Sequence, residues 1–405
     1  MLKRSTEEET DPLLTCKFSD KEFDFVGYIV IDSAIRGRCC GGVRTSSEVT
    51  LEETIWLAKN MTLKYGFLGI PLGGAKVGIR IRGSLSKLKR KLAFTKVGKI
   101  LSPFITGGSY STGTDMGTSD EDIDCLLNAA TNEQKNWKHA PTPVYTSWTM
   151  LVSALEALNQ LGLELDDSTV AIEGFGKIGS SAANVFSESG ARIIAISTQK
   201  GAIYNSKGLN VTKLLELKRE YGDDIVNYYT AAKKITKSAL MCLPADILLP
   251  CAGSWTISSA NAHKLKTKII CPGANIPLTG EAEEILFNRK VISLPDFVSN
   301  CGGVLGAFMG SLVSEQGKKE IIEKYFGKRV SQVIQFSREE GIPPIKVAQK
   351  IAMVRFNETR AKSETGDLKK RVSQLVKQTI PKIYREIFVK PRAKNVFIRM
   401  LHSAE

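Results

Sequence analysis

Residues 168–183 read S-T-V-A-I-E-G-F-G-K-I-G-S-S-A-A, and this stretch decides the fold of the second half of the chain. The apolar run 170–172 predicts a short strand, which leads into Gly174, Gly176 and Gly179 at G-x-G-x-x-G spacing. A small-residue helix and the strand A-R-I-I-A-I-S follow. In this strand–turn–helix–strand context the glycines permit a tight turn and let backbone N–H groups approach a pyrophosphate. The stretch therefore predicts a Rossmann-like dinucleotide-binding unit.

The end of the second strand of this unit indicates which dinucleotide it prefers. An acidic residue usually stands there and accepts a hydrogen bond from the ribose 2′-hydroxyl. Here Thr198, Gln199 and Lys200 occupy the position, so the acceptor is missing and a cation is near. We expect NAD or NADP as the cofactor, with a slight preference for NADP or use of both.

Three further strand-like runs follow: A-D-I-L-L-P-C-A, K-I-I-C-P-G-A-N and V-I-S-L-P-D-F-V-S-N-C-G-G-V. Strands that repeat between helices predict a parallel sheet. Asn275 and Asn300 each close one of these strands, at the edge where open α/β sheets bind their ligands. Asparagine also forms turns, and that simpler role is the alternative for both residues.

Two lysines twelve residues apart are the informative feature of the first half. Lys64 closes a predicted helix whose start, Thr50 followed by Glu53, has the spacing of a capping box. Lys76 lies on a glycine-rich turn or strand, P-L-G-G-A-K-V-G-I. A free lysine titrates near ~10.4, and desolvation or a second cation lowers that pKa toward a working base. We expect both ammonium groups to face one cleft; the alternative is two solvated surface lysines.

The segment Y-S-T-G-T-D-M-G-T-S-D-E-D-I-D, residues 110–124, reads as a loop followed by a helix start. Asp115 is flanked there by small residues, and Ser119 or Asp120 is placed to cap the next helix. A later helix, T-S-W-T-M-L-V-S-A-L-E-A-L-N-Q-L-G, is predicted to end at Gly162.

Composition indicates a water-soluble protein of two domains. The 405 residues are 42% hydrophobic and 24% charged, and no apolar run approaches the ~20 residues that span a bilayer. The N-terminal residues have no apolar segment typical of a secretory signal, so we expect a cytoplasmic protein. Eight cysteines without C-x-x-C spacing and three histidines support neither a metal site nor a disulfide framework.

The formal net charge of +14 is concentrated in two places, residues 80–99 and the segment from Arg360 onward. That second segment holds twelve Lys and Arg against four Asp and Glu. A basic tail can bind nucleic acid or an anionic membrane. No motif for such recognition is present, so we favour a solvated helical face or a subunit contact, with neither nucleic acid nor membrane as a partner.

Four motifs, in this order and spacing, resemble the glutamate/leucine/phenylalanine/valine dehydrogenase family over residues 27–358. They are M-T-L-K with P-L-G-G-A-K, then T-D-M-G-T, then G-F-G-K-I-G, then G-A-N with N-C-G-G-V. The resemblance implies an α/β protein with a substrate-binding and dimerisation domain at 1–148 and an NAD(P)-binding Rossmann domain at 149–310. Residues 311–405 would form a helical segment with a basic tail that packs back on the first domain.

The same resemblance implies reversible NAD(P)-dependent oxidative deamination of an L-amino acid to a 2-oxo acid and ammonia, in a homo-oligomer. Lys64 would bind the substrate α-carboxylate. Lys76 would activate the water that attacks the iminium, and Asp115 would exchange protons with the α-amino group. The remaining candidates are Gly73 and Gly74 for the substrate and Thr146, Gly174, Gly176, Lys177, Ile178, Gly179, Thr198, Asn275 and Asn300 for the cofactor.

Two departures from the family pattern bear on the substrate. Glutamate-specific members place a lysine and a serine where this chain has Cys40 and Ala307. A glutamate side-chain carboxylate would then be buried without a partner, at a cost on the order of several kcal/mol. We therefore expect an apolar amino-acid substrate. The alternatives are a glutamate dehydrogenase proper, or a non-catalytic dinucleotide-binding paralogue with a basic, anion-binding tail.

Two smaller departures bear on activity. Val77 replaces a glycine often found after the catalytic lysine, and a β-branched side chain there is expected to narrow the cleft. Ser147 replaces the glycine of the usual T-G pair, which requires an ordinary backbone conformation at that position.

Overall fold

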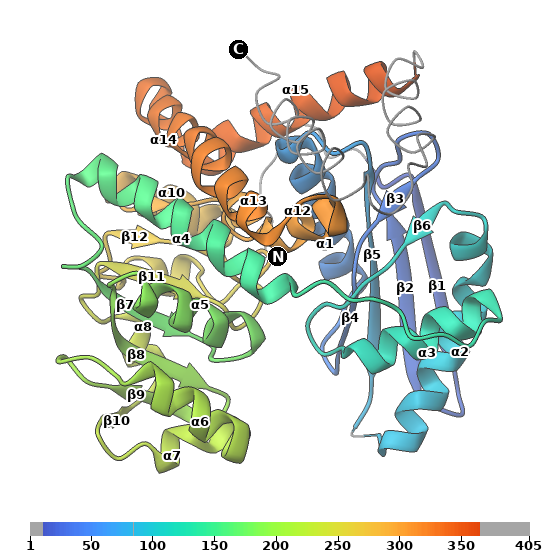
Figure 1. Ribbon diagram of the computed structural model, residues 1–405, viewed down its shortest axis with the longest axis horizontal. Helices are drawn as coiled ribbons and strands as arrows, with labels where there is room; N and C mark the ends of the chain where they lie inside the picture. Colours follow the sequence, from blue (N-terminus) through green and yellow to red (C-terminus); the bar gives the residue numbers. More distant parts are fainter. Residues whose placement is uncertain (1–10, 84, 365–405) are drawn as a thin grey trace. The chain divides into compact units, whose positions relative to one another are not determined.

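The computed structural model describes residues 11–83 and 85–364, which form two compact α/β units (Figure 1). The described part of the first unit is residues 11–139, without residue 84, together with 352–364; the second is 140–351. The two-domain α/β class predicted from the sequence is confirmed. The unit boundary near the C-terminus falls inside one helix, α15 (Pro344–Glu364). The N-terminal residues 1–10 and most of the basic tail lie outside the described residues.

The first unit is built on a sheet in the order β1-β2-β5-β3-β6, with β4 also paired to β5. Its strands are β1 (Leu14–Asp20), β2 (Phe25–Ile31), β3 (Cys39–Cys40), β4 (Val43–Ser46), β5 (Gly73–Ile81) and β6 (Tyr110–Ser111). β1, β2 and β5 pair antiparallel, whereas β3 and β4 run parallel to β5. Lys76 thus lies within a nine-residue strand at the centre of the sheet.

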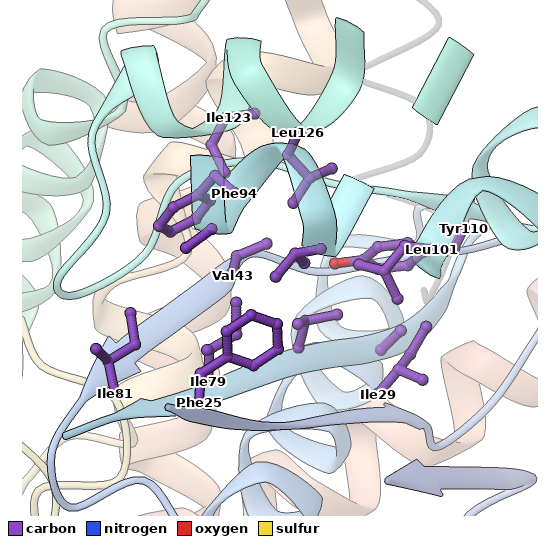
Figure 2. Packing of buried hydrophobic residues seen from close by; sticks show 14 of the residues in the cluster. Phe25, Ile29, Val43, Ile79, Ile81, Phe94, Leu101, Tyr110, Ile123 and Leu126 are labelled. Atoms are coloured by element: carbon purple, nitrogen blue, oxygen red, sulfur yellow. The ribbon is translucent and has the colours of Figure 1, made fainter. Parts of the chain in front are cut away.

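The helices of this unit cover the two faces of β5 differently. They are α1 (Leu51–Leu68), α2 (Lys87–Thr106) and α3 (Asp120–Thr131). Val77 and Ile79 of β5 join Phe94 of α2 and Ile123 of α3 in one buried cluster, and Figure 2 shows these helices above the strands. Side chains alternate along a strand, so Lys76 belongs to the opposite face. On that face a Cβ added at Gly74 would lie 2.2 Å from the backbone nitrogen of Thr62 in α1.

Val77 therefore does not narrow the site of Lys76, and the expectation from its β-branched side chain is wrong. Val77 is fully buried in the cluster between the sheet and α2 and α3. Its side chain points away from Lys76 because neighbouring residues of a strand face opposite sides of the sheet.

The second unit holds a seven-stranded sheet in the order β10-β9-β8-β7-β11-β12-β13. Its strands are β7 (Thr169–Glu173), β8 (Arg192–Thr198), β9 (Gly201–Tyr204), β10 (Lys233–Ile235), β11 (Ile247–Pro250), β12 (Ile269–Ile270) and β13 (Ile292–Ser293). Five neighbouring strands, β8, β7, β11, β12 and β13, run parallel, as the sequence predicts. β9 and β10 add an antiparallel edge. The strand order reverses at β7, which is where doubly wound sheets bind ligands.

Helices connect these strands and continue to the end of the described chain. They are α4 (Thr142–Leu161), α5 (Lys177–Glu188), α6 (Val211–Tyr221), α7 (Ile225–Tyr228), α8 (Lys237–Met241), α9 (Ser259–Ala262), α10 (Gly280–Asn288), α11 (Asp296–Ser299), α12 (Gly302–Met309), α13 (Glu315–Glu320) and α14 (Gly327–Glu340). The predicted helix end at Gly162 and the Ser119 cap are both present. Neither Asn275 nor Asn300 closes a strand as predicted. β12 already ends at Ile270, before Asn275, and the one-turn helix α11 stands between β13 and Asn300.

Candidate active site

Lys76 is a buried cation held against a carboxylate. Its side chain is 4% exposed, and its Nζ lies 2.9 Å from Oδ2 of Asp115. Asp115 follows β6, in the loop that the sequence predicts, and its backbone N–H donates to Oγ1 of Thr118. The structure therefore brings together the lysine of a central strand and the aspartate of a separate loop.

Arg44 of β4 completes this contact from the other side. Its Nε donates to the same Oδ2 of Asp115 at 2.9 Å, and its guanidinium also donates to Oε1 of Glu53 at 2.6 Å. Two cations and two carboxylates thus alternate in one buried network of Lys76, Asp115, Arg44 and Glu53. Pairing of this kind is what makes burial of four charged groups tolerable.

The pKa values of Lys76 and Asp115 are shifted in directions that would suit proton transfer. Burial lowers the pKa of Lys76; Asp115 opposes this shift, and Arg44 adds to it. For Asp115, burial alone would raise the pKa, but the charges of Lys76 and Arg44 together hold it well below its usual range. Asp115 is therefore a carboxylate across the working pH range, and Lys76 loses its proton more readily than an ordinary lysine.

Cys40 adjoins this network through the sheet. In β3 it pairs with Gly74 of β5, two residues before Lys76. Burial raises the pKa of the Cys40 thiol, although a hydrogen bond with Tyr65 and the charge of Lys76 act against that shift. The residue that stands at the expected side-chain position of the substrate is therefore a neutral thiol.

The first unit gathers most of the substrate residues predicted from the sequence. Gly73, Gly74 and Lys76 lie on β5, and Cys40 and Asp115 meet them through strand pairing and the ion pair. Lys64 is buried on α1, and the cation whose charge acts on Lys76 is Arg44. Ala307 lies apart from them in sequence, on the second unit, where it is exposed on α12.

Sequence reasoning missed Arg44, Glu53 and Tyr65. Glu53 was predicted to take part in a capping box with Thr50. The Thr50 side chain does accept from the Glu53 backbone N–H, but the Glu53 carboxylate binds Arg44. An arginine inside the short strand V-R-T-S, nine residues before a glutamate, was the signal that could have found this pair.

The second unit contains a cavity of ≈ 440 Å³ at the carboxyl ends of its parallel strands. It is lined by residues that include Glu173, Gly174, Gly176, Thr198, Gln199, Asp223, Lys237 and Asn261. A Cβ added at Gly179 would lie 1.9 Å from the Gly174 carbonyl oxygen, so the helix can start this close to β7 only with glycine. A Cβ at Gly176 would meet no atom within 4 Å. Packing thus explains Gly179, whereas Gly176 leaves open space that suits a bound phosphate.

Three of the predicted cofactor residues, Thr146, Asn275 and Asn300, lie at the start of α4 and around α11. Asn300 Nδ2 donates to the Ala274 carbonyl at 2.8 Å and to Oδ1 of Asn275 at 3.2 Å. The buried Oδ1 of Asn300 has no hydrogen-bond partner among the described residues, so it can accept from a ligand. Thr146 is buried on α4. The residue after it, Ser147, has ordinary helical backbone and bonds Ser181 of α5 at 2.9 Å, so it fits in place of glycine.

None of the helices in the described ranges has the length and apolar character to cross a membrane. Over those same ranges, no group of three or more His, Cys, Asp or Glu side chains is placed to hold a metal ion.

Comparisons with known proteins match both units. The family model for the Glu/Leu/Phe/Val dehydrogenase dimerisation domain covers residues 14–132, and that for glutamate/leucine/phenylalanine/valine dehydrogenase covers 117–364. Among curated relatives, a glutamate dehydrogenase of Thermotoga maritima is 34% identical over 69% of this chain and 70% of its own. An NADP-specific glutamate dehydrogenase of Saccharolobus shibatae is 32% identical over 74% and 76%. A hetero-hexameric glutamate dehydrogenase from Thermus thermophilus shares the fold, with a TM-score of 0.76 and 23% identity over 86% of this chain and 89% of its own.

An α/β fold of this kind, matched along both units, defines an oxidoreductase that acts on the CH–NH2 group of amino acids with a nicotinamide dinucleotide. The chain belongs to the glutamate/leucine/phenylalanine/valine dehydrogenase family, which confirms the resemblance seen in the sequence.

The buried network predicts that Glu53 supports the contact between Lys76 and Asp115 by holding Arg44 in place. Glu53→Gln removes the carboxylate that balances Arg44, so Arg44 should turn further toward Asp115 and disturb its contact with Lys76. We expect kcat/KM for amino-acid oxidation to fall about tenfold, the size of a lost charged hydrogen bond. Steady-state kinetics of this variant beside Glu52→Gln, which changes an exposed neighbour on the same turn, measure the effect. Equal rates for both variants would contradict the role.

Proposed function

We propose that the protein catalyses the reversible oxidative deamination of an L-amino acid with an apolar side chain to a 2-oxo acid and ammonia. The observation that carries this proposal is the buried ion pair of Lys76 and Asp115, steadied by Arg44 and placed beside the neutral thiol of Cys40.

Three charged residues of the first unit then act on the substrate. Lys64 pairs with the α-carboxylate of the substrate. Lys76, once it has lost its proton, draws a proton from the attacking water, which its lowered pKa favours. Asp115 is ionised in the resting site, so it can accept a proton from the α-amino group and return it during the reaction. Gly73 and Gly74 would meet the substrate only through their backbone, because other parts of the first unit occupy the space where their side chains would lie.

The second unit holds the cofactor in this proposal. When bound, the dinucleotide supplies the hydride acceptor of the reaction. The loop of Gly174, Gly176, Lys177, Ile178 and Gly179 binds its pyrophosphate, because backbone N–H groups at the start of α5 favour an anion. The nicotinamide end is held by Thr146, Asn275 and Asn300, of which Asn300 offers the unpaired Oδ1.

The cavity in the second unit bears on the choice of dinucleotide. Thr198 stands at the end of β8 and donates to the Asp223 carbonyl, so no acidic side chain of β8 faces the cavity at this point. Lys237 lines the cavity and favours a 2′-phosphate, whereas the Asp223 side chain can still accept from a 2′-hydroxyl. We propose use of both dinucleotides with NADP preferred. The S. shibatae relative, named as NADP-specific, supports that direction.

The preference for an apolar substrate rests on what the site lacks. A side-chain carboxylate at the Cys40 position would face a neutral thiol. The family resemblance gives Ala307 the position of a serine in glutamate-specific members, and alanine has no hydroxyl. A buried, unpaired carboxylate is strongly disfavoured. An aliphatic or aromatic side chain pays no such penalty.

Glutamate is the second candidate substrate, because both curated relatives named above are glutamate dehydrogenases. The non-catalytic alternative is disfavoured by the intact Lys76–Asp115 pair. A cytoplasmic homo-oligomer completes the proposal, with the matched dimerisation domain as its support.

A substrate screen tests the proposal directly. Oxidation of glutamate, leucine, phenylalanine and tryptophan is followed with NAD and with NADP as the absorbance of the reduced dinucleotide. We expect kcat/KM for the best apolar substrate to exceed that for glutamate by about 100-fold. NADP should be preferred over NAD by about fivefold, as befits a partly exposed ion pair. Glutamate as the best substrate would end the apolar proposal, and no turnover of any amino acid would end the catalytic one.

Replacing Cys40 tests the substrate determinant itself. Cys40→Lys supplies the missing cation, so kcat/KM for glutamate should rise about tenfold while that for the apolar substrate falls. Cys40→Ala keeps the position neutral and should leave the ratio of the two substrates near its original value. A ratio that moves equally in both variants would show that charge at residue 40 does not set the substrate.

A further inference from the structure

Lys218 of α6 holds the glycine loop of the second unit from behind. Its Nζ donates to the carbonyl oxygens of Phe175 at 2.5 Å and Gly176 at 2.6 Å, and to Oγ of Ser180 at 2.9 Å. The same ammonium lies 5.1 Å from the centre of the Phe175 ring. Its three hydrogen bonds use all three donors of the ammonium group, two on backbone carbonyls of the loop and one on a hydroxyl of α5.

Because peptide groups are planar, these contacts also fix the direction in which the N–H groups of the loop point. In a trans peptide the carbonyl and the following N–H point in opposite directions. A carbonyl of Phe175 fixed on Lys218 therefore turns the N–H of Gly176 away from α6, and the Gly176 carbonyl does the same for the N–H of Lys177. These are the second glycine and first helical residue of G-x-G-x-x-G, whose N–H groups meet a pyrophosphate.

The first half of the loop has a separate anchor. The N–H of Gly174 donates to Oγ of Ser197 at 3.0 Å, and the N–H of Phe175 donates to the Ser197 carbonyl at 2.6 Å. Ser197 belongs to β8, so the sheet fixes the loop up to Phe175. Lys218 anchors the Phe175 carbonyl. It shares the Gly176 carbonyl with Ser180, whose N–H and Oγ donate to the same oxygen at 3.0 Å and 2.7 Å.

Lys218 is partly buried, and burial disfavours a charged ammonium group. A lysine would not be expected there unless its contacts with the loop offset that cost. Burial lowers the pKa of Lys218 to about 8, and Asp223 of the turn after α6 opposes that shift. The groups that touch the ammonium from the loop and from α5 are uncharged: two carbonyls, one hydroxyl and one aromatic ring. Most lysines avoid such partial desolvation by extending into water.

We propose that Lys218 is a positioning residue for the cofactor, orienting the peptide planes on either side of Gly176 so that their N–H groups receive the dinucleotide pyrophosphate. This inference rests on the proposed dinucleotide site in the glycine loop. Lys218 acts through the loop backbone and touches no reacting atom.

Dinucleotide binding to the full-length protein tests this role, with NADPH and NADH as the probes and nicotinamide fluorescence as the signal. Lys218→Met keeps the length of the side chain but removes its donors, and we expect Kd to rise about tenfold. At saturating cofactor kcat should stay within about twofold, because the loss is one of binding and not of chemistry. Lys218→Arg, which still donates as a cation, should recover most of the affinity.

Lys213→Met, an exposed lysine on the same helix, is the matched control and should bind like the wild type. Wild-type affinity in Lys218→Met would overturn the inference while leaving the proposed function intact. Failure of the wild-type protein to bind either dinucleotide would instead overturn the proposed site in the glycine loop, and with it this inference.

Should Lys218→Met not fold, the pH dependence of binding decides. The wild-type Kd should rise as the pH increases through about 8 and Lys218 loses its proton. Lys218→Arg keeps its charge, so its Kd should stay constant over the same range. A wild-type Kd that does not change between neutral and alkaline pH would contradict the role of Lys218.

Discussion

The carboxylate of Asp115 is the charge on which the first unit is organised. A single oxygen, Oδ2, is 2.9 Å from both Nζ of Lys76 and Nε of Arg44, and Glu53 balances the second cation. Removing any one partner leaves an uncompensated buried charge, which costs roughly 3–5 kcal/mol. The elements that carry these residues, two strands, a loop and the first turn of α1, are therefore held in one arrangement by electrostatics as well as by packing. The close approach of α1 to Gly74 is part of the same arrangement.

That arrangement gives each partner a fixed protonation behaviour. Arg44 cannot lose its proton in any working range, and its pKa is raised further: burial alone would lower it, but Asp115 and Glu53 outweigh burial. Asp115 is held ionised, and Lys76 is the member of the network that loses a proton more readily than an ordinary lysine. In the second unit, Ser197 and the Lys218 ammonium fix the loop backbone through hydrogen bonds before any phosphate arrives. Both units thus present preorganised polar groups, which is the feature that most favours catalysis.

Local sequence patterns predicted the fold, and they singled out Lys76 and Asp115, which the structure brings into contact. The glycine spacing after 170–172 identified the dinucleotide unit, and the parallel strands followed from their apolar runs. Lys76 and Asp115 stood out because glycines and small residues surround them. The edge strands β9 and β10, four and three residues long, carry too weak a pattern to be seen.

Non-local partners were what the sequence could not supply. Arg44 meets Asp115 only because β4 runs parallel to β5, and 71 residues separate the two in the chain. Lys218 reaches Phe175 from a helix 43 residues later, and nothing in its own helix marks it. Val77 was predicted to narrow the cleft because only its sequence neighbour Lys76 was taken into account. The alternation of side chains along β5 instead directs Val77 into the hydrophobic core. Pairing across a sheet or between helices has to be seen in three dimensions.

The pH dependence of kcat/KM for amino-acid oxidation, in the wild type and in Lys76→Ala, tests the role of Lys76 most directly. In the wild type, kcat/KM should rise with pH and level off below 10.5, the ordinary lysine value, because burial and Arg44 lower the pKa of Lys76. Lys76→Ala should lose about 10²–10⁴-fold in kcat/KM together with that rise. A Lys76→Ala protein that keeps the wild-type rate and the wild-type pH profile would contradict the assignment of Lys76 as the base.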